Sequence, residues 1–296
     1  MEGESKLHFT FITPFIEEDF FKPVKKGMRD AAKLFSVDVE FTGTKGANTQ
    51  EVDELISIFE KSIKDGCNGI ALSFCDLTKF NHVVNQAVER GFPVVAFNID
   101  TTDVSNKRLS AVCQNFYEAG KTVSRTALAH IREGSKILMT MHNEGIPALE
   151  ERLAGEQEIL KEKNVTWKCI VTGNTPNLAA AAIKEALNLD REISAVLCTG
   201  QSDTEGAGIV ISSESLNRNI YVAGFDLSPG ILKFIDAGVI DFTIDQQPYI
   251  QGFYPVVQLF FYCKYGIKPS DIDVGAAVVN KTNVKSIIQA NKLGYR

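Results

Sequence analysis

The sequence lacks most of the patterns that reveal an enzyme or a membrane protein. No apolar run reaches the roughly 18 residues that a membrane-spanning helix requires. No G-x-S-x-G, P-loop or H-E-x-x-H motif is present, and no two residues stand out as a paired acid and base. We therefore expect neither a membrane span nor catalysis.

Metal-ligand spacing is absent as well. The 6 cysteines occur singly in apolar surroundings, without a C-x-x-C pair, and the 4 histidines show no ligand spacing with them or with each other. Such cysteines are interpreted as small buried hydrophobes. We expect no metal and no cofactor.

Positive charge is in deficit. The chain has 31 Lys and Arg against 37 Asp and Glu, a net charge of -6, and contains no basic run. This argues against nucleic acid and anionic membranes as partners. The first residues, MEGESKLHF, include no hydrophobic signal region. Either the protein is cytosolic, or an export signal has been removed and Met1 was introduced in its place.

What the sequence does contain is a regular alternation of short apolar runs with amphipathic helical patterns. The runs predict strands at 7–13, 37–42, 69–74, 93–98, 109–114, 136–141, 166–172, 193–199 and 220–225. Predicted helices include 20–35, 49–66, 78–90 and 117–131. This alternation is typical of parallel sheets with helices on both faces.

The pattern restarts after residue 105, and the 296 residues suggest about two domains. The last part adds a strand at 243–245, a helix at 248–265 that Pro248 begins, a strand near 276–280 and a closing helix. No flexible linker separates the halves, so strands should cross directly between them. We predict one domain at 6–114 plus 247–276 and a second at 115–246 plus 277–296.

Polar residues follow nearly every predicted strand. Ligands of open α/β sheets bind outside the carboxyl ends of the strands, so these positions are the candidates for a site. They are Ser73, Asp76, Asn98, Asp100, Gln114, Asn115, Asn143, Thr175, Gln201, Asp203, Asp226 and Gln246. Each one alone is readily explained as a cap or turn residue. So many at one sheet edge favour a polar cleft.

The turn after the first strand excludes a nucleotide site of the usual kind. It has no glycine and carries Glu17, Glu18 and Asp19, which suit the start of a helix but repel phosphate. Helix capping accounts for at least one of the three. A neutral ligand rich in hydroxyl groups would tolerate them.

Four other side chains have two interpretations each. Arg152 begins a predicted helix, where it could bridge adjacent hydroxyls or simply be solvated. Phe20, Phe21 and Phe225 could offer flat faces to a sugar ring or pack into a core.

Five separated segments carry a family likeness: DFFKPVKKGMRDAAK, VVAFNID, CQNFYEAGK, VAGFDLSPGIL and TIDQQPYIQG. They resemble the periplasmic-binding-protein type I family, specifically the ribose/galactose-type sugar-binding proteins of ABC transporters. The resemblance covers residues 6 to about 290. It implies two doubly wound parallel-sheet α/β domains joined by a three-strand hinge, with a sugar bound in the interdomain cleft by hinge closure.

The resemblance also implies particular binding residues. The family's binding positions fall on Glu18, Phe20, Phe21, Asn98, Asp100, Gln114, Arg152, Asp226 and Gln246. The strand-end pattern adds Ser73, Asn143 and Gln201 as candidates. Gln247 should point to the opposite face from Gln246 if the strand extends that far.

Two departures from the ribose-type pattern put ribose itself in doubt. Asn98–Ile99 stands where ribose-type proteins carry an aspartate–arginine pair, and CTGQSDTEG is longer than their second-domain Asn-Asp turn. Another pentose, a hexose or a polyol remains open.

The resemblance implies a monomer that delivers a small neutral sugar or polyol to an ABC permease. Its location would be periplasmic or extracellular, with a membrane-anchored lipoprotein as an alternative. Two other functions remain: the ligand-sensing domain of a receptor kinase, and the effector core of a LacI-type regulator. The regulator would need a helix-turn-helix before its core, whereas the first predicted strand begins at Leu7.

Overall fold

The computed structural model describes residues 6–76, 78–101, 104–213 and 219–296. Residues 1–5, which belong to the N-terminal stretch considered above, lie outside these ranges. The chain forms two compact units. Unit 1 contains the residues up to Gln114, Gln247–Val274 and Tyr295, and unit 2 contains Asn115–Gln246, Gly275–Gly294 and Arg296. The chain therefore passes between the units after Gln114, Gln246 and Val274, and its last two residues are divided between them.

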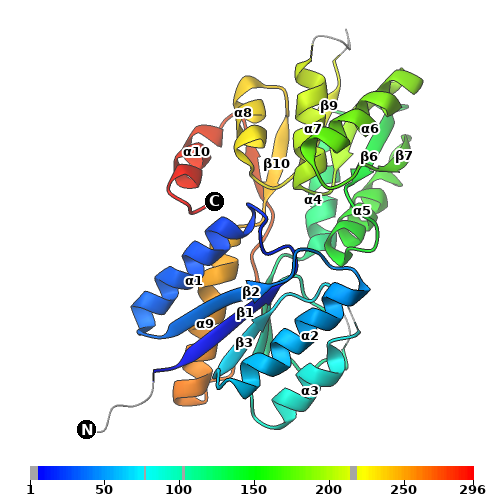
Figure 1. Ribbon diagram of the computed structural model, residues 1–296. Coiled ribbons are helices and arrows are strands. Elements are labelled where there is room, and N and C mark those ends of the chain that lie inside the picture. Colours follow the sequence, from blue (N-terminus) through cyan, green and yellow to red (C-terminus); the bar gives the residue numbers. More distant parts are fainter. Residues whose placement is uncertain (1–5, 77, 102–103, 214–218) are drawn as a thin grey trace. The chain divides into compact units, whose positions relative to one another are not determined.

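Unit 1 is built on a six-stranded sheet in the order β11-β5-β4-β3-β1-β2 (Figure 1). Its strands are β1 (His8–Thr13), β2 (Asp38–Gly43), β3 (Gly69–Leu72), β4 (Val94–Asn98), β5 (Ser110–Cys113) and β11 (Ile272–Asp273). All of its strand pairings are parallel. Every residue of β3, β4 and β5 is buried, as expected for strands covered on both faces.

Helices cover both faces of this sheet. They are α1 (Phe21–Phe35), α2 (Thr49–Lys64), α3 (Asn81–Glu89) and α9 (Pro248–Tyr265). Phe9, Phe11 and Phe97 point to one face and pack with α1 and α9. Ile12, Ile70 and Leu72 alternate with them on the other face and pack with α2 and α3. The strand period of two thus divides the core of unit 1 into two layers.

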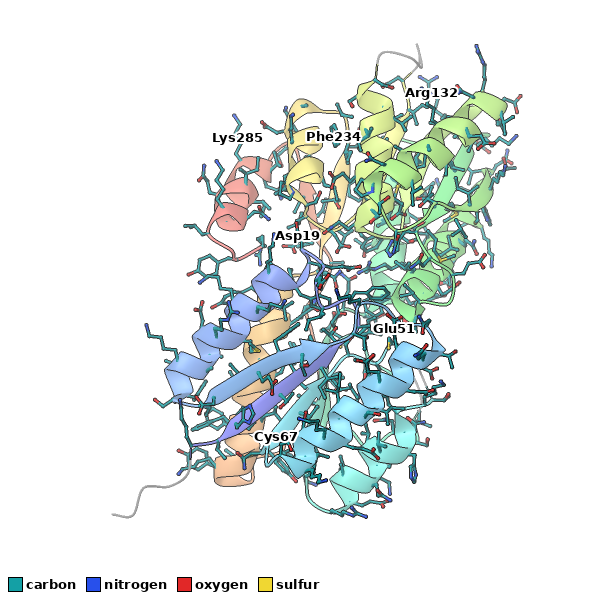
Figure 2. The ribbon with its side chains drawn as sticks, in the orientation of Figure 1. Asp19, Glu51, Cys67, Arg132, Phe234 and Lys285 are labelled. Atoms are coloured by element: carbon teal, nitrogen blue, oxygen red, sulfur yellow. The ribbon has the colours of Figure 1, made fainter. Side chains whose placement is uncertain are left out.

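Helix α2 illustrates how the sequence starts a helix next to a strand end. The Asn48 side chain accepts hydrogen bonds from the amides of Gln50 and Glu51, and the Glu51 carboxylate accepts one from the Asn48 amide. This reciprocal capping box satisfies amides that have no partner within the helix. Figure 2 labels Glu51 at this end of α2.

Unit 2 contains a second six-stranded sheet, in the order β12-β10-β9-β8-β6-β7. Its strands are β6 (Lys136–Met141), β7 (Thr166–Val171), β8 (Ile193–Cys198), β9 (Tyr221–Phe225), β10 (Phe242–Asp245) and β12 (Ala277–Asn280). Strands β6 to β10 are parallel, but β12 is antiparallel to β10. The predicted fold class is confirmed, and the edge strand β12 adds one antiparallel pairing that the sequence did not predict.

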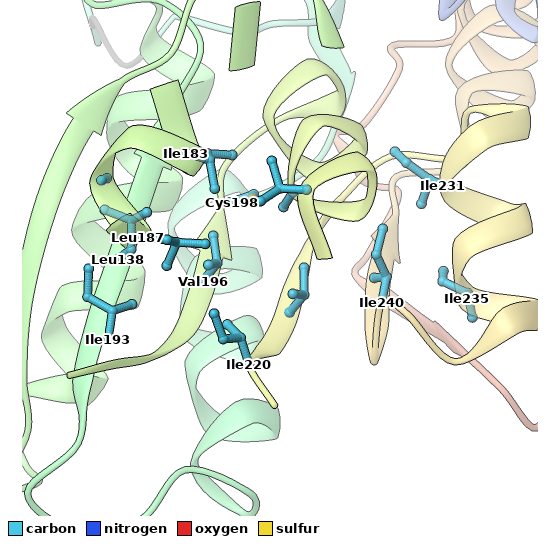
Figure 3. Packing of buried hydrophobic residues seen from close by; sticks show 14 of the residues in the cluster. Leu138, Ile183, Leu187, Ile193, Val196, Cys198, Ile220, Ile231, Ile235 and Ile240 are labelled. Atoms are coloured by element: carbon cyan, nitrogen blue, oxygen red, sulfur yellow. The ribbon is translucent and has the colours of Figure 1, made fainter. Parts of the chain in front are cut away.

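Six helices cover the two faces of the unit 2 sheet. They are α4 (Phe116–Leu128), α5 (Pro147–Leu160), α6 (Pro176–Leu189), α7 (Gln201–Ser212), α8 (Pro229–Ala237) and α10 (Val284–Lys292). One face packs with α4 and α5. The other packs with α6, α7, α8 and α10, and Figure 3 shows residues of this layer, among them Leu138, Val196, Ile183 and Ile231.

Glycine allows one helix pair in each unit to pack closely. A Cβ atom on Gly27 of α1 would lie 2.0 Å from the carbonyl oxygen of Tyr249 in α9. A Cβ atom on Gly120 of α4 would lie 2.0 Å from the carbonyl oxygen of Arg152 in α5. No real Cβ atom tolerates such a distance, so both helix contacts require glycine. The second contact fixes the main chain at a predicted site residue.

Within the described ranges, the structure contains no helix whose length and apolar character would allow it to cross a membrane.

Candidate functional site

The carboxyl end of β4 in unit 1 is a strained turn centred on Asn98. Asn98 has φ 63°, and the Ile99 amide donates to the Phe97 carbonyl at 2.8 Å, which closes a γ-turn. Positive φ is uncommon outside glycine, although asparagine adopts it more readily than most residues. Strain of this kind concentrates at binding sites.

The side chain of Asn98 is held from both of its ends. Ser73 donates from Oγ to Asn98 Oδ1 at 3.3 Å, and Asn98 Nδ2 donates to Gln251 Oε1 at 3.4 Å. All three side chains are buried. The structure thus joins two predicted residues, Ser73 and Asn98, and adds Gln251 of α9. Sequence reasoning missed Gln251 because it considered strand ends and not the first turn of the following helix.

Asp100, two residues beyond Asn98, forms an ion pair that the sequence did not suggest. Arg108 donates from Nε and Nη2 to the two carboxylate oxygens of Asp100. The Thr101 amide also donates to Asp100 Oδ1, at 2.8 Å. A planar guanidinium matches a carboxylate in this two-pronged geometry. The pair ties the loop after β4 to the chain just before β5.

The predicted aromatic pair lies at the start of α1 in unit 1. Phe21 is 3% exposed and belongs to the core, whereas Phe20 is half-buried. Their ring centres are 5.1 Å apart in an edge-on arrangement. Phe20 is therefore the member of the pair that can still offer a face to a ligand. Glu18 is exposed in the loop before it.

Gln114 is the last residue of the first segment of unit 1 and is 4% exposed. It follows β5 directly, at the same sheet edge as Asn98.

Asp226 is the centre of the corresponding edge in unit 2. It follows β9 with φ 73°, and two hydrogen bonds to β10 hold this backbone. The Asp226 amide donates to the Ile244 carbonyl, and Thr243 Oγ1 donates to the Asp226 carbonyl, each at 2.9 Å. Gln246 donates from Nε2 to Asp226 Oδ1 at 2.6 Å. The structure therefore brings these two predicted residues into direct contact.

Burial raises the pKa of Asp226, while Arg152 and the hydrogen bond from Gln246 oppose this shift. Asp226 as a whole is 8% exposed. A buried acid with polar partners on two sides is well suited to bind hydroxyl groups that replace its lost hydration.

Arg152 lies in the first half of α5, near the carboxyl end of β8. It donates from Nη1 to the Thr199 carbonyl at 2.9 Å. Its guanidinium carbon lies 4.0 Å from the ring centre of Phe225 and 5.1 Å from that of Phe116. Burial lowers the pKa of Arg152, and the carboxylate of Asp226 is the strongest of the charges that oppose this. Phe225 is fully buried with Arg152 over its ring, so it acts as a support for the arginine.

Asp203 has a structural role at the start of α7. It accepts hydrogen bonds from Thr140 Oγ1 at 2.7 Å, from the Thr199 amide at 2.9 Å and from the Gly200 amide at 3.1 Å. The side chain is fully buried.

Two other predicted residues are half-buried at the same edge. They are Gln201, the first residue of α7, and Asn143, just after β6.

His142 also lies at this edge, between β6 and Asn143, and sequence reasoning missed it. Histidines were considered only as metal ligands, and none of the four has a ligand-like spacing. Among the described residues, no group of three or more His, Cys, Asp or Glu side chains is placed to hold a metal ion.

Two α/β units that each carry polar side chains at the carboxyl ends of their strands are typical of solute-binding proteins. The chain belongs to the periplasmic binding protein domain family, whose model matches residues 9–266.

The individual relatives share less than a third of their residues with this chain. The xylose/arabinose-binding protein XylF of Sulfolobus acidocaldarius is 27% identical, over 99% of this chain and 76% of its own length. A solute-binding protein of Burkholderia graminis, solved in complex with D-arabinose, superposes with a TM-score of 0.85 at 23% identity, covering 96% of this chain and 99% of that one. A carbohydrate transporter protein of Acidothermus cellulolyticus, solved with myo-inositol, gives 0.83 at 23%, covering 98% and 100%.

Proposed function

We propose that the protein is an extracytoplasmic binding protein that captures a small neutral sugar or polyol and delivers it to an ABC importer. The observation that carries the proposal is the Asp226 carboxyl group, held in a left-handed backbone, bonded by Gln246 and faced by Arg152. A carboxylate and a guanidinium at one edge bind adjacent hydroxyl groups in complementary ways, one as acceptor and the other as donor.

The charges favour a neutral ligand. The positive charge of Arg152 is offset by Asp226 and Asp203, so no surplus remains to bind a phosphate. Unit 1 adds the amide of Asn98 and the half-buried ring of Phe20. Amides select hydroxyls without requiring charge, and an aromatic face suits the apolar side of a sugar ring.

The relatives support the same class of ligand. The curated relative is described as binding xylose and arabinose, and the two structural relatives were solved with D-arabinose and myo-inositol. A pentose or a cyclic polyol is accordingly the ligand class that we expect. The function is binding without chemical conversion, by a monomer located outside the cytoplasm that associates with a permease.

Isothermal titration calorimetry and thermal shift over pentoses, hexoses, polyols, cyclitols and sugar phosphates test the proposal. At a free ligand concentration about a hundred times Kd, binding should add about 2.7 kcal/mol to the free energy of unfolding. We expect a neutral pentose or polyol to bind and its phosphate to bind much more weakly. If only phosphorylated sugars bind, or none of these ligands does, the proposal is wrong.

Matched variants then locate the site. Asp226→Asn and Asn98→Ala should each weaken binding at least tenfold, because each removes a group at a carboxyl edge. Asp241→Asn and Asn68→Ala are the controls: Asp241 accepts from the Val222 amide and Asn68 from the His8 amide, both at the amino ends of strands. A loss with either variant, and none with its control, would support a ligand contact at that carboxyl edge.

A further inference from the structure

His142 occupies a position that neither the family resemblance nor the strand-end search assigned. It directly follows β6, whose carboxyl end lies in the same sheet as those of β9 and β10. It lies near enough to Asp226 that a positive charge on its ring would oppose the burial-driven rise of the Asp226 pKa. His142 therefore belongs spatially to the Asp226 edge.

One nitrogen of the imidazole faces a buried carboxylate. Nδ1 of His142 is buried and lies 3.5 Å from Oδ1 of Asp203. The Asp203 side chain is fully buried, whereas that of His142 is 20% exposed. The exposed part of His142 therefore consists of atoms other than Nδ1. A buried carboxylate on the Nδ1 side orients an imidazole ring and directs Nε2 away from itself.

The absence of a side chain at Gly200 leaves the space that the His142 ring occupies. A Cβ atom at Gly200 would lie 2.5 Å from both Cε1 and Nδ1 of His142. Gly200 precedes α7 with φ -151° and ψ -176°, an extended backbone that any residue can adopt. The glycine is therefore needed here for the space that the imidazole occupies and not for its backbone conformation.

We propose that His142 is a ligand-binding residue whose Nε2 accepts a hydrogen bond from a hydroxyl group of the sugar or polyol, with Asp203 and Gly200 as its positioning residues. The inference rests on the proposed function and extends it to a further contact. It gives unit 2 an uncharged acceptor beside the acidic Asp226 and the cationic Arg152. A site with three different groups discriminates among sugars that differ in the orientation of one hydroxyl.

Two conservative variants separate this role from a structural one. The amide of Gln in His142→Gln can replace Nε2, and the shorter amide of Asn in His142→Asn can replace only Nδ1. Binding through Nε2 predicts that His142→Gln retains affinity within about threefold, while His142→Asn loses at least tenfold in Kd by calorimetry. His130→Gln and His130→Asn are the controls, because His130 stacks on Tyr221 at the beginning of β9, and they should leave Kd unchanged.

Deoxy analogues of the best ligand, each lacking one hydroxyl, complete the test. For one analogue, the tenfold loss caused by His142→Asn should disappear, because the hydroxyl that His142 binds is already missing. The inference is overturned if both His142 variants keep wild-type affinity, if both lose it equally together with thermal stability, or if no analogue abolishes the effect. Failure of the wild-type protein to bind any neutral sugar or polyol would overturn the proposed function itself, and it is visible before any variant is made.

Discussion

Gln246 and Asp226 are bonded side chain to side chain, with Gln246 Nε2 2.6 Å from Asp226 Oδ1 and both residues buried. The next residue, Gln247, instead donates from Nε2 to the Val274 carbonyl at 2.5 Å, within unit 1. Strand β10 ends at Asp245, and Gln247 has φ 51°. The two amides therefore diverge because of a left-handed turn at the unit boundary and not because of strand alternation.

Replacing these two glutamines should have different effects on sugar binding. Gln246→Ala removes the donor that orients Asp226, and a buried acceptor left without a partner costs on the order of 1–3 kcal/mol. Gln247→Ala loses a bond to a main-chain carbonyl and does not touch Asp226, so its effect on affinity should be small. Titration calorimetry on the best ligand measures both. Equal losses, or a larger loss for Gln247→Ala, would contradict this assignment.

Glu156 should make the protein less stable as the pH rises. It lies one turn after Arg152 on α5 and is fully buried. In the part of the chain that the structure describes, neither of its carboxyl oxygens has a hydrogen-bond partner. Burial, reinforced by Asp203 and opposed by Arg152, raises the pKa of Glu156 well above the ordinary glutamate value of 4.5. Between pH 4.5 and this higher pKa, the folded protein therefore keeps a proton on Glu156 that the unfolded chain releases.

The sign of the effect follows from this difference. The stabilising contribution of protonated Glu156 is complete below pH 4.5 and is lost as the pH rises toward the higher pKa of the folded state. One proton corresponds to a slope of at most about 1.4 kcal/mol per pH unit. Chemical denaturation of the wild type and of Glu156→Gln between pH 5 and 8 tests it. The glutamine variant should show a smaller decrease, and identical slopes would rule out this origin.

Much of the fold was predictable because local patterns specify it. Buried runs and amphipathic helices identified nearly every strand, and the family resemblance confirmed by the comparison supplied the topology. Strand β11 was missed because two residues, Ile272–Asp273, carry no periodicity. The antiparallel direction of β12 could not be predicted, since it depends on the path by which the chain returns to β10.

The candidate site was only partly predictable. The rule that ligands bind at carboxyl strand ends selected Asn98 and Asp226, but it does not reveal their positive φ angles. Arg108 lies two residues before β5 and was not among the predicted site residues. Its contact with Asp100 depends on how the intervening loop folds back, and no local pattern encodes this.

Gly120→Ala should disrupt the Arg152 region specifically. The added Cβ would lie 2.0 Å from the Arg152 carbonyl, so α4 and α5 must separate, which costs about 1–3 kcal/mol of stability. Arg152 moves with its main chain, and sugar affinity should fall as well. Gly27→Ala is the control for stability alone: the same clash, with the Tyr249 carbonyl, should destabilise the α1–α9 contact of unit 1 without moving the main chain of Arg152. A fully stable Gly120→Ala protein would contradict the packing described here.

The Asp100–Arg108 ion pair should stabilise the turn at Asn98, and a double-mutant cycle can measure its strength. The two side chains are 24% and 18% exposed, so each single change leaves a partly buried charge without its partner. We expect Asp100→Asn and Arg108→Met each to lower stability and sugar affinity, and the double variant to lose less than the sum, with a coupling energy of about 0.5–3 kcal/mol. The exposed pair Lys61–Asp65 is the control and should couple by about 0.5 kcal/mol or less. Denaturation and calorimetry on all variants measure the stability and the sugar affinity. If the losses of the two single variants are additive in the double variant, the ion pair does not stabilise the turn, because either single change already removes their shared contact.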